Sequence, residues 1–86
     1  MYVVKELFMF ERTVFSSRLK ALIKSRGKTY TELGTILHVT STQISDMANG
    51  KTGTSMERLF VLCQYFDISA DYLLGLTDEP RKLKKQ

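Results

Sequence analysis

The fold of this 86-residue chain is decided by residues 29–51, TYTELGTILHVTSTQISDMANGK. Apolar residues recur every three or four positions on both sides of a short break, at Leu33, Ile36, Leu37, Ile44, Met47 and Ala48. This spacing gives each half one buried face if each half forms a helix. The stretch therefore predicts two short helices joined by a tight turn.

Both expected helices carry signals at their ends. Thr29 with Glu32 is a capping box that starts the first helix, and Thr40 or Ser41 can cap the second. The second helix is expected to end at Asn49-Gly50, because glycine readily takes the left-handed backbone that follows a helix.

The turn between the two helices depends on three residues. Gly34 leaves room for the second helix to pass closely, and Val39 is expected to fill the corner. His38 must either adopt a left-handed backbone, at an energetic cost, or reshape the turn.

The second helix exposes short hydrogen-bonding side chains, which are Ser41, Thr42, Gln43, Ser45, Asp46 and Asn49. A single helix is narrow enough to enter the major groove of DNA, where such groups can reach the edges of bases. The pattern therefore indicates a helix-turn-helix that binds DNA.

The longer span 15–80 resembles the Cro/CI-type helix-turn-helix family, also called XRE-type regulators. Besides the helix-turn-helix, the resemblance rests on the segments FSSRLKALIKSRG (15–27), ANGKTGTS (48–55) and FDISADYLLGLTDEP (66–80). It implies an all-α, compact five-helix bundle of the lambda-repressor-like DNA-binding type. The turn departs from the family pattern at His38, where glycine is usual. Ile23 and Ala48 replace a charged pair, an exchange that need not lower stability.

The remaining helices follow the same periodicity. We expect them at about residues 16–26, at about 55–66 behind a Thr54–Glu57 capping box, and after Ser69 as far as Gly75. The chain then divides into an N-terminal arm (1–14), a helix-turn-helix domain (15–78) and a basic tail (79–86).

The N-terminal arm is more apolar than a free segment in water should be, with Tyr2, Val3, Val4, Leu7, Phe8, Met9 and Phe10. We favour a role in pairing two subunits. Docking on its own domain is an alternative, and a disordered arm or an incorrectly assigned start codon also remains open. The arm is too short to span a membrane.

The net charge of +4 is unevenly distributed. Five basic residues and no acidic one lie between residues 15 and 30, and the tail is also basic. This is expected if both regions approach phosphates, although a solvated helix face would explain any single lysine equally well.

The family resemblance also implies which residues contact DNA. Ser41, Thr42, Gln43 and Asp46 are expected at base edges, and Tyr30, Ser45, Asn49, Lys51 and Thr52 at phosphates. Gln43 could instead contact phosphate, or pair with adenine through both ends of its amide. Asp46 is tolerated facing DNA mainly where it accepts a hydrogen bond from the amino group of a cytosine.

The sequence offers nothing from which to build an enzyme or a metal site. The chain has one histidine, His38, and one cysteine, Cys63, which lies on an apolar helical stripe and is expected in the core. We expect no catalytic residues, cofactor or metal. Without a signal peptide or a long apolar run, the protein is expected in the cytoplasm and away from membranes.

The expected function is that of a sequence-specific transcriptional regulator. We expect a homodimeric repressor that binds double-stranded DNA at an inverted repeat, with a protein antagonist as one way to relieve binding. The alternative is an antitoxin-like or other partner-binding module that binds DNA only secondarily.

Overall fold

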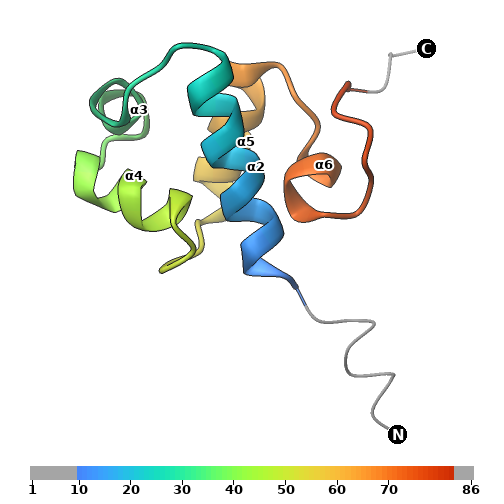
Figure 1. Cartoon of the computed structure of the whole chain (residues 1–86). Coiled ribbons are helices and arrows are strands. Elements are labelled where there is room, and N and C mark those ends of the chain that lie inside the picture. The colour runs from blue at the N-terminus through green and yellow to red at the C-terminus, as the bar shows by residue number, and fades with distance from the viewer. Residues whose placement is uncertain (1–9, 83–86) are drawn as a thin grey trace, which may run out of the picture.

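The computed structural model describes residues 10–82 as a bundle of helices (Figure 1). The helices are α2 (Arg12–Ser25), α3 (Tyr30–Leu37), α4 (Ser41–Ala48), α5 (Met56–Phe66) and α6 (Ala70–Leu74). No strand occurs between residues 10 and 82. The expected all-α, five-helix architecture is therefore confirmed. The structure of residues 1–9, which form most of the expected N-terminal arm, lies outside the described range.

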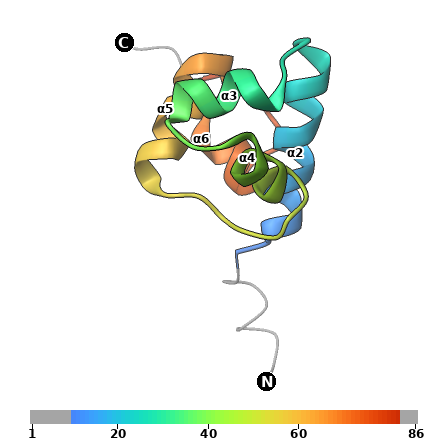
Figure 2. The ribbon, with the colours of Figure 1, turned by 90° about the vertical axis from the view of Figure 1, so that its left-hand side faces the viewer.

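Helix α2 is the centre of the bundle. It packs against α4 on one side and α6 on another, while α3 and α4 pack on each other (Figures 1 and 2). The largest fully buried side chains come from every helix, and they are Phe15, Leu19, Leu33, Ile44, Leu62, Phe66 and Leu73. One continuous core therefore holds the five helices together.

Two sequence-based interpretations of the core are confirmed. Cys63 is buried, and burial raises the pKa of its thiol. Ile23 and Ala48 are 4% and 2% exposed, so the positions that carry a charged pair in relatives belong here to the apolar core. Two apolar side chains avoid the desolvation cost that an ion pair would carry at this depth.

The helix-turn-helix begins and ends as its local sequence predicts. The Thr29 hydroxyl accepts a hydrogen bond from the Glu32 N–H at 3.0 Å, and the Glu32 carboxylate accepts one from the Thr29 N–H at 2.8 Å. At α4 the capping residue is Thr40, and Gln43 completes a second capping box. Gly50 follows α4 with φ of 80°.

The turn between α3 and α4 keeps a left-handed residue although that residue is His38, with φ of 60° and ψ of 43°. The next residue, Val39, donates its N–H to the Gly34 carbonyl oxygen at 2.8 Å and packs its side chain against the core. A Cβ atom added to Gly34 would lie 2.6 Å from the Val39 carbonyl oxygen. The close approach of the two helices thus requires glycine at position 34.

One expected helix start and one expected helix cap are wrong. Helix α2 begins at Arg12, four residues earlier than the expected Ser16. The earlier turn packs Val14 beside Gly75 and brings Phe15 into the core, which compensates for a start at Glu11 without a side-chain cap. Helix α5 is capped by Ser55, whose hydroxyl accepts from the Arg58 N–H at 3.1 Å, and not by Thr54.

Two arginines of the α2 region fasten the C-terminal part of the domain. The Arg18 guanidinium donates to the carbonyl oxygens of Tyr72 and Thr77 at 2.5 and 2.7 Å, and it lies 4.1 Å from the centre of the Tyr72 ring. Arg26 donates to the Phe66 carbonyl oxygen at 2.9 Å, at the end of α5. These two charges therefore serve the fold.

None of the described helices has the length and apolar character needed to cross a membrane.

Candidate nucleic-acid interface

Helix α4 has one face in the core and one face free. Ile44, Met47 and Ala48 are buried, whereas Ser41, Thr42 and Gln43 are exposed and Ser45 and Asp46 are half-buried. The helix lies at the surface, in front of α2 in the view of Figure 2. Three of the expected base-contacting residues, Ser41, Thr42 and Gln43, are therefore exposed in the first turn of the helix, and Asp46 follows one turn later with part of its surface covered.

The side chain of Gln43 is fixed by a hydrogen bond to Thr40, the residue that caps α4. Its side-chain oxygen accepts from the Thr40 N–H at 2.9 Å, which leaves the amide NH₂ group as the free end. Pairing with both N6 and N7 of adenine uses the oxygen and the NH₂ group together. In this conformation Gln43 is therefore better prepared to donate to a phosphate.

Asp46 shares a hollow of about 330 Å³ with Gln43, Thr52 and Arg58. Arg58 lies in the first turn of α5 and was not among the expected site residues. Its positive charge on the same hollow reduces the repulsion that the Asp46 carboxylate would meet near phosphates. The charge arithmetic of the sequence could not place these two residues together, since they lie on different helices.

Asn49 and Ser45 form a polar group at the end of α4. The Asn49 NH₂ group donates to the Ser45 carbonyl oxygen at 2.8 Å and to the Ser45 hydroxyl at 3.2 Å. The Asn49 side-chain oxygen accepts from the Lys20 ammonium group at 2.9 Å. Helix α2 thus brings a positive charge to the C-terminal end of α4.

The loop after α4 carries Lys51 and Thr52, both exposed. The Arg12 guanidinium donates to the Lys51 carbonyl oxygen at 3.2 Å. Arg12, Lys20 and Lys51 therefore lie along the short segment 49–51, and we call these three residues the cationic cluster. Arg12 was missed because the first fourteen residues carry no net charge, and Lys20 was noticed only as one of several basic residues before Tyr30.

Tyr30 and the basic tail occupy different parts of the surface. Tyr30 is the first residue of α3, and its ring packs partly against the core. The described part of the tail lies across the domain from α4 (Figure 1). There Lys82 donates to the Gln64 side-chain oxygen at 2.6 Å, and hydrogen bonds from Arg81 lower the pKa of the Glu79 carboxyl group to about 2. Both described tail cations therefore have partners within the domain.

The pattern of the family described as "Helix-turn-helix" matches residues 19–73, which is more than half of the chain. The chain belongs to the Cro/CI-type helix-turn-helix family. Helices α3 and α4 both lie within the matched residues. Family and fold are those of DNA-binding regulators and not those of enzymes.

Known relatives agree with this membership. The chain is 27% identical over 67 residues to the uncharacterized HTH-type transcriptional regulator YobD of Bacillus subtilis, a match that covers 78% of this chain and 60% of YobD. The chain therefore spans less than two thirds of that relative's length.

Solved structures show the same fold. The P22 c2 repressor, in complex with a synthetic operator, is 28% identical with a TM-score of 0.67, over 71% of this chain and 92% of the repressor. A transcriptional regulator from Listeria innocua is 25% identical with a TM-score of 0.70, over 84% of this chain and 64% of that regulator. The lambda-repressor-like bundle expected from the sequence is confirmed.

Proposed function

We propose that the protein is a transcriptional repressor that binds an inverted-repeat operator in double-stranded DNA as a homodimer. The observation that carries the proposal is the arrangement along α4, whose first turn exposes Ser41 and Thr42 and whose C-terminal end meets the cationic cluster at residues 49–51. The P22 c2 repressor, which is similar over most of its length, is described bound to an operator, and this supports the same kind of target.

Base readout is assigned to the first turns of α4. The hydroxyls of Ser41 and Thr42 can donate to or accept from base edges, and the Thr42 methyl group can contact the methyl group of thymine. Asp46 accepts from the amino group of a cytosine, since a carboxylate has no proton to donate at neutral pH. Arg58 on the shared hollow makes that approach less costly.

Phosphate contacts hold α4 in register but carry no base sequence. We assign them to the residues expected from the family, Tyr30, Ser45, Asn49, Lys51 and Thr52, and we add Gln43, Arg12 and Lys20. The additions follow from the amide NH₂ group that Gln43 leaves free and from the position of the two cations beside residues 49–51.

A dimer is proposed because one recognition helix reads only a few base pairs, which is too little to select a site in a genome. Two copies related by a twofold axis would bind half-sites about one turn of DNA, ~34 Å, apart. Occupancy of such a site would exclude polymerase. Because the target is genomic DNA, the protein is expected in the cytoplasm, where its own concentration or a protein antagonist would set occupancy.

The proposal is tested by selecting binding sites from random duplex DNA at physiological salt, followed by titration of the enriched sequence against a scrambled one. A palindromic sequence bound at least ~1,000-fold more tightly than the scrambled DNA is expected. No enriched sequence would instead favour the antitoxin-like, partner-binding module.

Two variants separate base readout from phosphate contact. Thr42→Ala should weaken binding to the selected operator far more than binding to scrambled DNA. Lys51→Ala should weaken binding to both DNAs. It should also make the slope of log binding constant against log salt concentration less negative by about one, the contribution of one phosphate contact. Equal losses on both DNAs for Thr42→Ala would remove Thr42 from base readout.

A further inference from the structure

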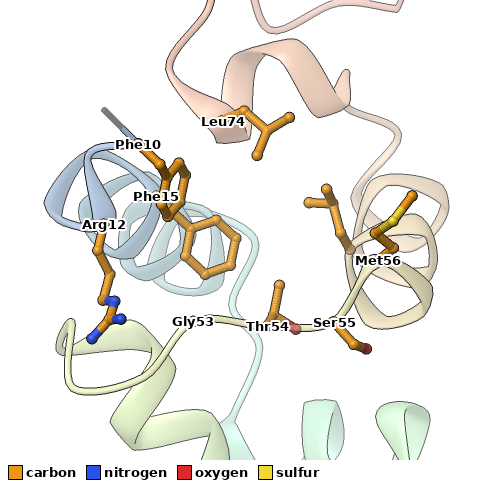
Figure 3. A pocket seen from close by; sticks show the side chains of 9 residues that line it. Phe10, Arg12, Phe15, Gly53, Thr54, Ser55, Met56 and Leu74 are labelled. Carbon is orange, nitrogen blue, oxygen red and sulfur yellow. The ribbon is translucent and has the colours of Figure 1, made fainter. Parts of the chain in front are cut away.

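An apolar groove opens beside the start of α2. It has a volume of about 330 Å³ and lies between α2, the loop that precedes α5, the first turn of α5, and α6 (Figure 3). Its apolar walls are formed by Phe10, Phe15, Met56, Leu59 and Leu74. The Phe10, Met56 and Leu74 side chains surround the open space in Figure 3.

The apolar surface continues beyond the groove along α5. Met56 is 85% exposed, and Phe60, one turn later on the same helix, is 65% exposed. Phe10 is 49% exposed at the rim. Single exposed apolar residues are normal, but several large ones around a concave site are typical of a surface that is covered by a partner.

We propose that this groove receives residues 2–9 of a second copy of the chain, so that two copies exchange their N-terminal segments. The inference rests on the proposed homodimer and names its interface. The segment has the matching composition, because six of its eight residues are apolar and its two charges, Lys5 and Glu6, cancel. Burial of these side chains on apolar walls removes both surfaces from water.

The place where the segment joins the domain favours a second copy over the same copy. The segment joins the domain at Phe10, which is itself part of the groove wall. A segment that folds back on the groove beside Phe10 needs a tight turn, yet residues 2–12 contain no Gly, Pro, Asn, Asp or Ser to favour one. A segment that continues extended from Phe10 spans roughly 28 Å over eight residues, which is long enough to contact a facing copy.

The groove also connects the interface with the DNA-binding surface. Arg12 lines the groove and donates to the Lys51 carbonyl oxygen, and Gly53 lies in the groove wall two residues beyond Lys51. Subunits paired at this groove would therefore have their phosphate-binding loops next to the interface. Such an arrangement fixes the spacing between the two recognition helices.

The direct test is paramagnetic NMR on the full-length protein. A nitroxide is attached to Val3→Cys in a Cys63→Ala background and mixed with an equal amount of methyl-labelled protein that carries no nitroxide. The Met56, Leu59 and Leu74 methyl signals should lose most of their intensity, whereas a nitroxide at the exposed Thr35→Cys on α3 should leave them unchanged. Loss of signal only when nitroxide and methyl label share one molecule, or no loss at all, would overturn the proposal.

Sedimentation equilibrium gives an independent test with a matched control. Met56→Glu and deletion of residues 2–9 should each raise the dimer dissociation constant at least tenfold, and the combination should cost no more than either change alone. Leu76→Glu places the same charge on an exposed apolar residue outside the groove and should have no effect. A dimer unaffected by both changes that still selects a palindrome would refute the groove but retain the repressor; a monomer without a selected site would refute both.

Discussion

His38 differs from the family pattern in residue type, while its backbone keeps the left-handed conformation that favours glycine. Its left-handed conformation, φ of 60°, costs a residue with a Cβ atom about 1 kcal/mol relative to glycine. Replacement by glycine removes this cost, but glycine also has more conformational freedom in the unfolded chain, which offsets part of the gain in stability. His38→Gly should therefore raise the free energy of unfolding in urea by about 0.5–1 kcal/mol.

The control for His38→Gly is the introduction of a glycine inside a helix. Ala21 is exposed in the middle of α2, so Ala21→Gly should lower the free energy of unfolding by about 1 kcal/mol. A loss of stability in both variants would mean that the His38 side chain contributes contacts that outweigh its backbone strain.

Residues whose partners are close in sequence were predictable, and residues with distant partners were not. The Thr29–Glu32 box needs only three intervening peptide units, so its sequence is sufficient to predict it. The acceptors of Arg18 are carbonyl groups 54 and 59 residues away, which no local pattern identifies. Where two neighbouring residues could both cap a helix, the sequence predicts the helix start but not which residue caps it. At α5 the capping hydroxyl is that of Ser55 and not that of Thr54.

At the scale of elements, the crossing of α3 and α4 depends on Gly34. An alanine Cβ atom would lie 2.6 Å from the Val39 carbonyl oxygen, which belongs to the backbone and cannot rotate away. Gly34→Ala should lower the free energy of unfolding by about 1–3 kcal/mol, and it should weaken operator binding because α4 is displaced.

Gly53→Ala is the matched control for the Gly34 prediction. A Cβ atom at position 53 would meet nothing within 4 Å, so the free energy of unfolding should change by no more than about 0.5 kcal/mol. Equal effects of the two alanines in urea unfolding would show that α3 and α4 can separate without cost.

The attachment of α6 to α2 depends on Arg18. Hydrogen bonds from charged donors are worth about 1.5–3 kcal/mol, and the Arg18 side chain is only 20% exposed. Arg18→Ala should therefore lower the free energy of unfolding by about 2 kcal/mol. Arg18→Lys should recover only part of that loss, because one ammonium group cannot reproduce the fork of a guanidinium.

Lys24 provides the control for Arg18, since it is exposed on the same helix. Lys24→Ala should change the free energy of unfolding by no more than about 0.5 kcal/mol. If Arg18→Ala were equally mild, the hydrogen bonds to Tyr72 and Thr77 would be replaced by water without cost.

At the scale of the whole molecule, the fold was predictable because helical periodicity and caps recur along the sequence from Thr29 to Gly75. The electrostatic surface was predictable only in part. The concentration of basic residues before Tyr30 was visible in the sequence, but Arg18 and Arg26 are used within the domain. Arg12, hidden in a segment without net charge, lies beside Lys51.

The position of Arg12 and Lys20 beside residues 49–51 predicts how DNA binding depends on salt concentration. Each phosphate contact contributes about −0.9 to the slope of log binding constant against log salt concentration. Arg12→Ala and Lys20→Ala should each make that slope less negative by about one, on operator and scrambled DNA alike. Fluorescence anisotropy titrations between about 50 and 200 mM salt would measure the change over a range in which phosphate contacts dominate.

Lys82 provides the control that separates an effect of the cationic cluster from an effect of net charge. It belongs to the described part of the tail, which lies across the domain from α4 (Figure 1), and it has Gln64 and Asp67 as partners. Lys82→Ala should therefore leave the salt slope unchanged although it removes the same charge. If all three alanine variants made the slope less negative by the same amount, only total charge would matter. If only Arg12→Ala and Lys20→Ala do so, DNA contacts the surface formed by α4, the loop after it and the adjoining part of α2.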